Sequence, residues 1–463
     1  MKQDSQLFGT EKISKILWKM APPVMLAQLI QALYNIVDSF FVGRYSESGL
    51  TALSIIYPIQ LLMIAFAVGT GVGINTCMAH YLGLSEDEKA DEIGGIGTPL
   101  TLFMWAVFAV FCYFFMPAYA KMSTDSAEVI KEVVMYGRIV CVFSFGLFLE
   151  SIWTKILQAN GNMKTPMIAQ IAGAVTNIIL DPLLIFGMFG LPKMGIAGAA
   201  LGTLIARLFE AGMICGYLLL KDEKIGFRVK HLGMKTADLL GEYIRISIPV
   251  LISDGILAIG NNTVAMVIGR LGVTFVAANA ITSVTQQLST VMIQGVCQAG
   301  AIVTGQTLGE GKQEQAQSQA YRFLGLGLGL GMLSAFFIMA VSPAIIGSYK
   351  VSEETAEVAA QLMHAISLIL IFQATNSIMT KGVLRGGGDT KMLMLADNLF
   401  LWVVSIPLGM LAGFVFHFPA FWIYVCLKAD QILKAVWCVF RLRSGKWMKK
   451  ITVGKVSGQE DRA

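Results

Sequence analysis

Charged side chains are scarce in this sequence. Asp, Glu, Lys and Arg make up 14% of the 463 residues, whereas apolar residues make up 55% and the mean hydropathy is +0.67. A soluble globular protein carries roughly 25% charged residues, and its surface could not solvate so much apolar material. The composition therefore excludes a soluble protein and predicts a polytopic membrane protein.

Cysteine is sparse as well. The seven cysteines lie singly in apolar stretches and form no CxxC motif. A disulfide framework or a zinc site needs clustered cysteines, so neither is predicted, and a buried small hydrophobe is the sufficient interpretation. The N-terminal segment MKQDSQLFGTEKISK precedes no short apolar run with a small-residue cleavage site, so we expect the first span to be retained.

Motifs of catalysis and of nucleotide binding are missing too. An intramembrane prenyltransferase needs clustered aspartates, and no DxxD or DxxxD occurs within an apolar run. The segment GQTLGEGKQ at 305–313 lacks the spacing of a phosphate-binding loop and the Ser or Thr after Lys312. We therefore expect no enzyme activity, no cofactor and no ATP-driven pump. The basic stretch 441–450 is better explained by attraction to anionic lipid than by nucleic-acid binding.

Apolar runs, in contrast, fill the chain. A helix needs roughly 20 apolar residues to cross the hydrocarbon core of a bilayer. The sequence contains twelve such runs, which predict an all-α protein of twelve transmembrane helices. They lie near residues 16–43, 50–80, 93–119, 132–158, 166–188, 195–220, 243–270, 275–306, 320–348, 356–384, 392–413 and 417–441.

The basic residues predict the orientation of these helices. With the N-terminus placed inside, about 24 Lys and Arg fall in cytoplasmic segments and about 6 in outer loops, so both termini are expected in the cytoplasm. The expected organisation is an N-terminal six-helix bundle at 1–220, a cytoplasmic linker at 221–240, a C-terminal bundle at 241–441 and a basic cytoplasmic tail at 442–463.

The chain repeats itself. When the sequence is aligned with itself at an offset of 226 residues, identical residues of the first and second halves coincide. After one inserted residue the offset becomes 227. An even number of spans per copy gives both copies the same orientation, so the two bundles are expected to be parallel repeats around a central cavity. The matches include Pro23 with Pro249, Asn35 with Asn261, Gln60 with Gln286, Gly83 with Gly309, Leu157 with Leu384, and Lys164 with Lys391.

Two glycine-rich runs are predicted to pack closely. AVGTGVG at 67–73 and GLGLGLG at 325–331 lie inside apolar spans. Gly69 with Gly73, and Gly325 with Gly329, have the GxxxG spacing that lets helix backbones approach each other.

The two halves differ in their intramembrane carboxyl groups. Asp38 corresponds to Val264, whereas Asn177 and Asp181 correspond to Val404 and Leu408 of the second half. Spacings of three and four residues place Gln28, Gln31, Asn35 and Asp38 on one face of the first helix. Asp38 and Asp181 both lie roughly 8–10 Å from the outer ends of their spans. The sequence therefore predicts that the two aspartates lie at matching depth.

Two plainer interpretations compete with a functional one. Asp181 before Pro182 fits the N-cap of a restarted helix, and Asp38 could reach outward to Arg44. Charged groups inside a span are costly, however, and usually mark an ion or proton path. A carboxylate in a low-dielectric medium favours its protonated form, while carboxylate, amide and hydroxyl oxygens also suit Na⁺, so the residues predict a cation site without naming the cation.

Several segments resemble the multidrug and toxic compound extrusion (MATE) family, most closely its DinF-like and MepA-like bacterial branch. They are NIVDSFFVGR (35–44), NIILDPLLIFG (177–187) and GIAGAALGT (195–203). The resemblance implies a secondary antiporter of a bacterial plasma membrane that exports lipophilic organic cations in exchange for H⁺ or Na⁺, and we expect a monomer. It implies that Asp38, Asn177, Asp181 and Thr203, with Asn35 beside them, bind the coupling ion, and that Pro23 acts as a hinge.

Other polar residues are predicted to line the substrate cavity. They are Glu150, which resembles a fourth-helix acid of some family members, and Asp254, Gln286 and His364. Asp397 has no evident partner in the sequence and is a further cavity candidate. Arg207 with Glu210, and Lys428 with Asp430, are expected to neutralise each other.

The alternative function is a flippase of lipid-linked oligosaccharide or polysaccharide precursors in the same superfamily. Such proteins share the repeat but typically have more spans, and they use cavity arginines to hold a pyrophosphate. Twelve spans and an acid-lined first half favour the antiporter. A channel has no need of two related bundles that rock, but the sequence leaves that class open.

Overall fold

The computed structural model describes residues 13–220, 237–348 and 352–449. These ranges are almost entirely helical and contain no strand. The predicted linker at 221–240 lies outside the described residues except for its last four, which form the first turn of α9 (Ala237–Arg270). The tail at 442–463 is described only as far as residue 449.

The first half contains the six predicted spans. Residues 132–158, predicted as one span, form two helices that meet at an angle of 40°. The elements are α2 (Ile13–Tyr45), α3 (Glu47–Gly83), α4 (Asp87–Ser123), α5 (Ala127–Val142), α6 (Phe145–Ala159), α7 (Lys164–Phe186), the 3₁₀ turn η1 (Met188–Gly190) and α8 (Ile196–Leu220).

The second half repeats this order, with π-helical segments inside two of its spans. After α9 come α10 (Val273–Gly309), α11 (Gln313–Ser348), α12 (Glu353–Ser377), the π-segment η3 (Ile378–Leu384), α13 (Thr390–Leu399), η4 (Phe400–Ser405), α14 (Ile406–Met410), η5 (Leu411–Val415), α15 (Ala420–Leu427) and α16 (Ala429–Arg443).

The helices have the length and apolar surface of membrane spans. In the described ranges eight single helices pass a test of length and composition, and two bent pairs raise the number to ten. The remaining two predicted spans are α2, which contains Pro22 and Pro23, and α15 with α16. Large side chains such as Phe114 and Phe336, 75% and 74% exposed, point outward as lipid-facing residues do.

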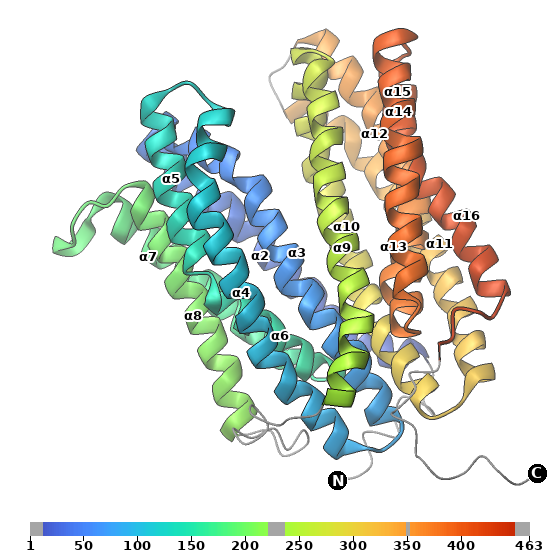
Figure 1. Ribbon diagram of the computed structural model, residues 1–463. Helices are drawn as coiled ribbons and strands as arrows, with labels where there is room; N and C mark the ends of the chain where they lie inside the picture. The colour runs from blue at the N-terminus through green and yellow to red at the C-terminus, as the bar shows by residue number, and fades with distance from the viewer. Residues whose placement is uncertain (1–12, 221–236, 349–351, 450–463) are drawn as a thin grey trace, which may run out of the picture.

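The two halves form separate groups that cross at one end. Figure 1 shows them converging where α3 meets α9 and α10, and diverging at the opposite end. The crossing is reciprocal: Ile16 and Met20 of α2 belong to the apolar core of the second half, whereas Tyr243 and Ile246 of α9 belong to a core of the first half. We refer to this as the closed end, and the basic residues predict that it faces the cytoplasm.

Glycine permits this crossing. A Cβ added at Gly83 would collide with the carbonyl oxygen of Gln306, and one at Gly309 would collide with that of His80. Gly69 and Gly73 lie against Leu251 and Ser247 of α9, so the predicted close packing of this pair is present.

The prediction for the second glycine run is wrong in register. Gly325 and Gly329 have no heavy atom within 4 Å of an added Cβ. Gly327 and Gly331 face α12 instead, where an added Cβ would lie 2.9 Å from Cα of Thr375 and 2.7 Å from Cα of Ile371. The alternating sequence offers two faces with the same spacing, and the rotation of α11 against α12 selects one of them.

Candidate cation site and central cavity

A polar cavity of about 560 Å³ lies inside the first half. Helices α2, α3, α5, α6, α7 and α8 contribute to its wall, and Gln28, Gln31 and Asp38 of the polar stripe predicted on the first helix face it. Its polar lining consists of Gln28, Gln31, Tyr34, Asp38, Ser54, Tyr57, Gln60, Tyr136, Ser144, Glu150, Ser151, Gln170, Thr203 and Arg207.

Asp38 of α2 meets Asp181 of α7 at this cavity. The two side chains are 7% and 0% exposed, and their carboxyl groups are close enough to act on each other electrostatically. Nδ2 of Asn177, one turn before Asp181, donates to Oδ1 of Asp181 at 3.2 Å and lies 3.5 Å from Oγ1 of Thr203. The structure thus brings together four of the five residues predicted for the coupling site, and the side chain of Asn35 lies outside the described residues.

Three oxygens of this cluster lack a hydrogen-bond donor. Oδ1 of Asp38, Oδ2 of Asp181 and Oδ1 of Asn177 are buried without a partner. Buried polar atoms are nearly always paired, and an unpaired one is costly. Two carboxyl groups and an amide oxygen, with a hydroxyl beside them, suit a proton or a hard monovalent cation. In the described part of the chain no three His, Cys, Asp or Glu side chains are grouped as a metal site would require.

Both plainer interpretations of the aspartates are wrong. Helix α7 runs unbroken from Lys164 to Phe186, so Asp181 does not cap a restarted helix. Because Pro182 has no N–H, it leaves the carbonyl of Ile178 without its usual helical partner. Arg44 lies over the ring of Phe40, 5.2 Å from its centroid, rather than serving as the partner of Asp38.

Gly202 makes room for Asp181. A Cβ at position 202 would lie 2.7 Å from Oδ1 of Asp181, closer than real side chains permit. Helix α8 can therefore approach α7 at this level only with glycine. The residue lies in the GIAGAALGT segment, directly before Thr203, but the sequence did not reveal its role.

A second group of charged residues lies on α8, beginning one turn after Thr203. Arg207 forms the predicted ion pair with Glu210 at 2.8 Å and donates to Oε1 of Gln31 at 3.2 Å. Its guanidinium lies 5.8 Å from the ring centroid of Tyr34, whose hydroxyl bonds Thr203. Tyr34 was not predicted, although the polar stripe of α2 passes beside it.

A central cavity of about 470 Å³ lies between the halves, near the closed end. Helices α2, α3, α6 and α7 wall it on one side, and α9, α10 and η3 on the other. Pro23 lines it together with the polar residues Gln28, Asn75, Thr76, Glu150, Ser151, Thr154, Lys155, Gln158, Gln170, Asp254, Asn261, Gln294, Gln298, Lys381 and Arg385.

Of the predicted cavity residues, Glu150 and Asp254 line this space. Glu150 borders both cavities, and its Oε1 accepts from Thr154 at 3.0 Å and from Gln170 at 3.4 Å. Asp254 forms an ion pair with Arg385 at 2.5 Å, which the sequence could not reveal because 131 positions separate them. Pro23 lies in the wall, within an uninterrupted α2.

The other two predicted cavity residues lie elsewhere. Gln286 bonds Gln373 at 3.3 Å and Tyr424 at 3.1 Å within the second half. His364 has an exposed side chain on α12. Neither residue lines the two cavities described above, because their helix faces are turned away from them.

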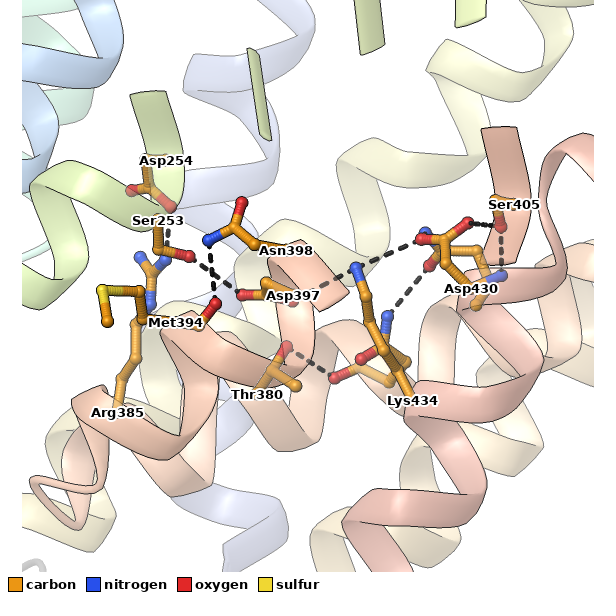
Figure 2. A network of polar contacts seen from close by, with 12 residues as sticks. Ser253, Asp254, Thr380, Arg385, Met394, Asp397, Asn398, Ser405, Asp430 and Lys434 are labelled. Atoms are coloured by element: carbon orange, nitrogen blue, oxygen red, sulfur yellow. Dashed lines mark hydrogen bonds and ion pairs between the residues drawn. The ribbon is translucent and has the colours of Figure 1, made fainter. Parts of the chain in front are cut away.

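The second half holds a buried charge network that the sequence did not predict. Nζ of Lys434 lies 3.1 Å from both Asp397 and Asp430, and Figure 2 shows it between them. Asp397 also accepts from Ser253 of α9 at 3.3 Å. The expectation that Asp397 lines the cavity is therefore wrong, and the ion-pair partner of Asp430 is Lys434 rather than Lys428.

Comparison with known proteins agrees with the repeat. The model of the MatE family matches two segments, residues 23–183 and 249–411, one in each half. The chain belongs to the MATE family. As a member it is a multi-pass membrane transporter and not an enzyme.

Individual MATE relatives cover between 64% and 96% of this chain. The probable multidrug resistance protein NorM of Thermotoga maritima is 24% identical over 443 residues, 95% of this chain and 94% of the relative. The multidrug export protein MepA of Staphylococcus haemolyticus is 26% identical over 64% of this chain and 65% of its own length. An outward-facing structure of a multidrug resistance MATE transporter has a TM-score of 0.86 at 19% identity, covering 96% of this chain and 99% of that one.

Proposed function

We propose that this protein is a secondary antiporter that exports organic cations and related drug-like molecules in exchange for H⁺ or Na⁺. The observation that supports this most is that Asp38 and Asp181 are buried next to each other, since two neighbouring carboxylates in a low-dielectric medium favour binding of a proton or another cation. The names of the multidrug relatives agree with the substrate class.

The coupling ion acts at Asp38, Asn177 and Asp181. When neither proton nor Na⁺ is bound, two negative charges face each other in a medium that screens them poorly, so α2 and α7 repel. A bound proton or Na⁺ removes that repulsion and draws the helices together. Ion binding is thereby converted into movement of α2, with Pro23 as its hinge.

The cavity of the first half supplies the substrate site. Its volume of about 560 Å³ suits a drug-sized molecule. The rings of Tyr34, Tyr57 and Tyr136 can lie against a delocalised cation, and Glu150 offers a carboxylate. Approach of α2 to α7 narrows this cavity and expels the substrate.

The direction of transport follows from the predicted orientation. With both termini in the cytoplasm, the closed end faces the cytoplasm, and ions enter from outside to release substrate there. Each net charge that moves inward per cycle, after the charge of the exported cation is subtracted, releases about 2.3 kcal/mol per 100 mV of membrane potential, and each tenfold ion gradient adds about 1.4 kcal/mol.

Asp38→Asn and Asp181→Asn test the coupling site. We expect each variant to lose transport of a fluorescent organic cation in vesicles under both a H⁺ and a Na⁺ gradient, because a neutral amide cannot exchange the ion. Asp125→Asn, at an exposed position, is the matched control. The gradient that suffices for the native protein identifies the ion.

Membrane insertion is checked for each variant by its yield after purification. Native-like transport by both variants would overturn the coupling role of this pair. Loss in Asp125→Asn would show that the assay reports damage rather than coupling.

A further inference from the structure

The central cavity carries more positive than negative charge. Lys155, Lys381 and Arg385 line it, against the carboxylates of Glu150 and Asp254. Arg385 is occupied by Asp254, with which it forms the 2.5 Å ion pair. The ammonium groups of Lys155 and Lys381 and the carboxylate of Glu150 are therefore available to bind a ligand.

Lys155 is a buried cation held by neutral groups. Its side chain on α6 is 6% exposed, and Nζ donates to Oε1 of Gln158 at 3.0 Å and to Oε1 of Gln298 at 2.9 Å. Among the described residues no carboxylate lies at ion-pair distance from it; Glu150 and Arg385 act on it electrostatically. A buried charge without a counter-ion costs several kcal/mol, so its retention indicates a function.

Lys381 is the counterpart of Lys155 in the other half. Sliding the sequence by 226 positions places Lys155 on Lys381. Lys381 lies in the π-segment η3 and is exposed to the cavity, and in the described ranges it forms no ion pair. The repeat thus presents one lysine from each half to the same space.

We propose that Lys155 and Lys381 form an anion subsite, which binds a carboxylate or phosphate group of the exported molecule. Glu150 lies at the junction of the two cavities, so a cationic group of the same molecule can lie against it while the acidic group reaches the lysines. The preferred substrates are then zwitterionic amphipathic molecules rather than simple cations. This inference rests on the proposed antiport function and refines its substrate class.

A matched pair of dyes tests the subsite. A rhodamine with a free carboxylate and its ethyl ester share the cationic ring system and differ in the anion alone. Binding of both to purified protein is measured by fluorescence anisotropy. We expect the native protein to bind the free acid about tenfold more tightly than the ester, because the acid makes one charge-assisted hydrogen bond that the ester lacks.

Lys381→Gln is expected to abolish this preference. It should weaken the binding of the free-acid dye about tenfold and leave the binding of the ester unchanged. Lys381→Arg should retain the preference, and Lys121→Gln, at an exposed position outside both cavities, should change neither dye. Lys155→Gln is the second variant, made after Lys381 because a buried lysine can affect folding.

Equal binding of the two dyes by the native protein would overturn the subsite. So would a preference for the acid that survives both Lys→Gln variants, which would reduce Lys155 to a tether between α6 and α10. Transport of the ester under an ion gradient reports the antiport function separately, because the ester lacks the group that the lysines bind.

A lipid headgroup offers the same chemistry as a soluble acid. Repeating the titration in vesicles of phosphatidylcholine, with and without phosphatidylglycerol, separates the two sources. Displacement of the acid dye by phosphatidylglycerol in the native protein, but not in Lys381→Gln, assigns the subsite to an anionic lipid. Binding unaffected by the lipid assigns it to a soluble substrate.

Discussion

At the scale of single residues, the coupling cluster depends on a residue without a side chain. Asp181 is fully buried between α7 and α8, and its Oδ1 occupies the space that a Cβ at Gly202 would require. The position of the carboxylate, and with it the contact to Asp38, is therefore set from the neighbouring helix. Sequence spacing predicted that Asn177 and Asp181 share one face of α7, but it could not predict which residue of α8 lies against that face.

We expect Gly202→Ala to impair transport by up to about 100-fold, because a displacement of about 1 Å at a reacting group can have that effect. The measurement is dye efflux under the gradient that the native protein uses. Gly212→Ala in the same helix is the control, since nothing lies within 4 Å of its added Cβ. Equal transport by native and Gly202→Ala protein would contradict a positioning role for Gly202.

Lys434, a buried lysine of the second half, leads to a prediction about stability rather than transport. Lys434 is 3% exposed and neutralises Asp397 and Asp430, which are 6% and 2% exposed. Lys434→Met leaves two buried carboxylates unpaired and should destabilise the protein by about 3–5 kcal/mol.

Thermal unfolding in detergent measures this effect. Lys164→Met, at an exposed position, should leave the melting temperature unchanged. A melting temperature of Lys434→Met equal to that of the native protein would show that the network contributes no net stability.

At the scale of helices, the repeat explains an irregular element. The offset between the halves grows from 226 to 227 somewhere between Gly83 and Leu157, which corresponds to residues 309–384. The π-segment η3 (Ile378–Leu384) lies in this interval, and a π-turn holds one residue more than an α-turn. The inserted residue is thus absorbed locally, and the π-turn presents Lys381 to the central cavity.

The packing of α11 on α12 yields a prediction at this scale. Gly331→Leu should destabilise the protein by roughly 1–3 kcal/mol, because the added side chain must displace the backbone at Ile371. Gly329→Leu, which has open space beside it, should have little effect. Thermal unfolding of the two variants compares the two faces of α11 directly. A lower stability of Gly329→Leu than of Gly331→Leu would show that Gly329 rather than Gly331 packs against α12.

At the scale of the whole molecule, the closed end holds the two halves together. The paired glycines of α3 and α10 bring their helices into contact there. Gln306 donates to the carbonyl of Ala159 at 3.0 Å, and the hydroxyl of Tyr243 donates to the carbonyl of Thr70 at 3.1 Å. All these contacts must separate before the cavity can open at this end.

Gly309→Leu should disfavour the closed end and shift the protein toward the opposite state. Spin labels at Ser123 and at Glu354, exposed positions in the two halves, report the other end in a cysteine-free background. We expect the distance between the labels to shorten in Gly309→Leu. Gly216→Leu, with open space at its Cβ, is the control, and an unchanged distance in Gly309→Leu would contradict the gate.

Much of the fold followed from local patterns in the sequence. Apolar runs indicated the spans, the tandem repeat indicated two parallel halves, and helical spacing placed Asp38 on the polar face of α2 and Asn177 beside Asp181. Those inferences need only hydropathy and helix periodicity, which neighbouring residues determine. The family match and the structure confirmed the fold class, whereas the roles of Asp38, Asn177, Asp181 and Thr203 stay predictions.

Contacts between helices were decided by the tertiary structure alone. The pairing of Asp254 with Arg385, the network of Asp397 with Lys434, and the packing of Gly327 on α12 all depend on how each helix is rotated and tilted. No spacing along the chain carries that information, because the partners come from helices far apart in the sequence.

The same rotation decides which polar side chains reach the cavities. It turns Gln286 and His364 away from them and brings Lys155 and Lys381 into one of them. Sequence periodicity defines the faces of a helix, but only packing against its neighbours decides what each face meets.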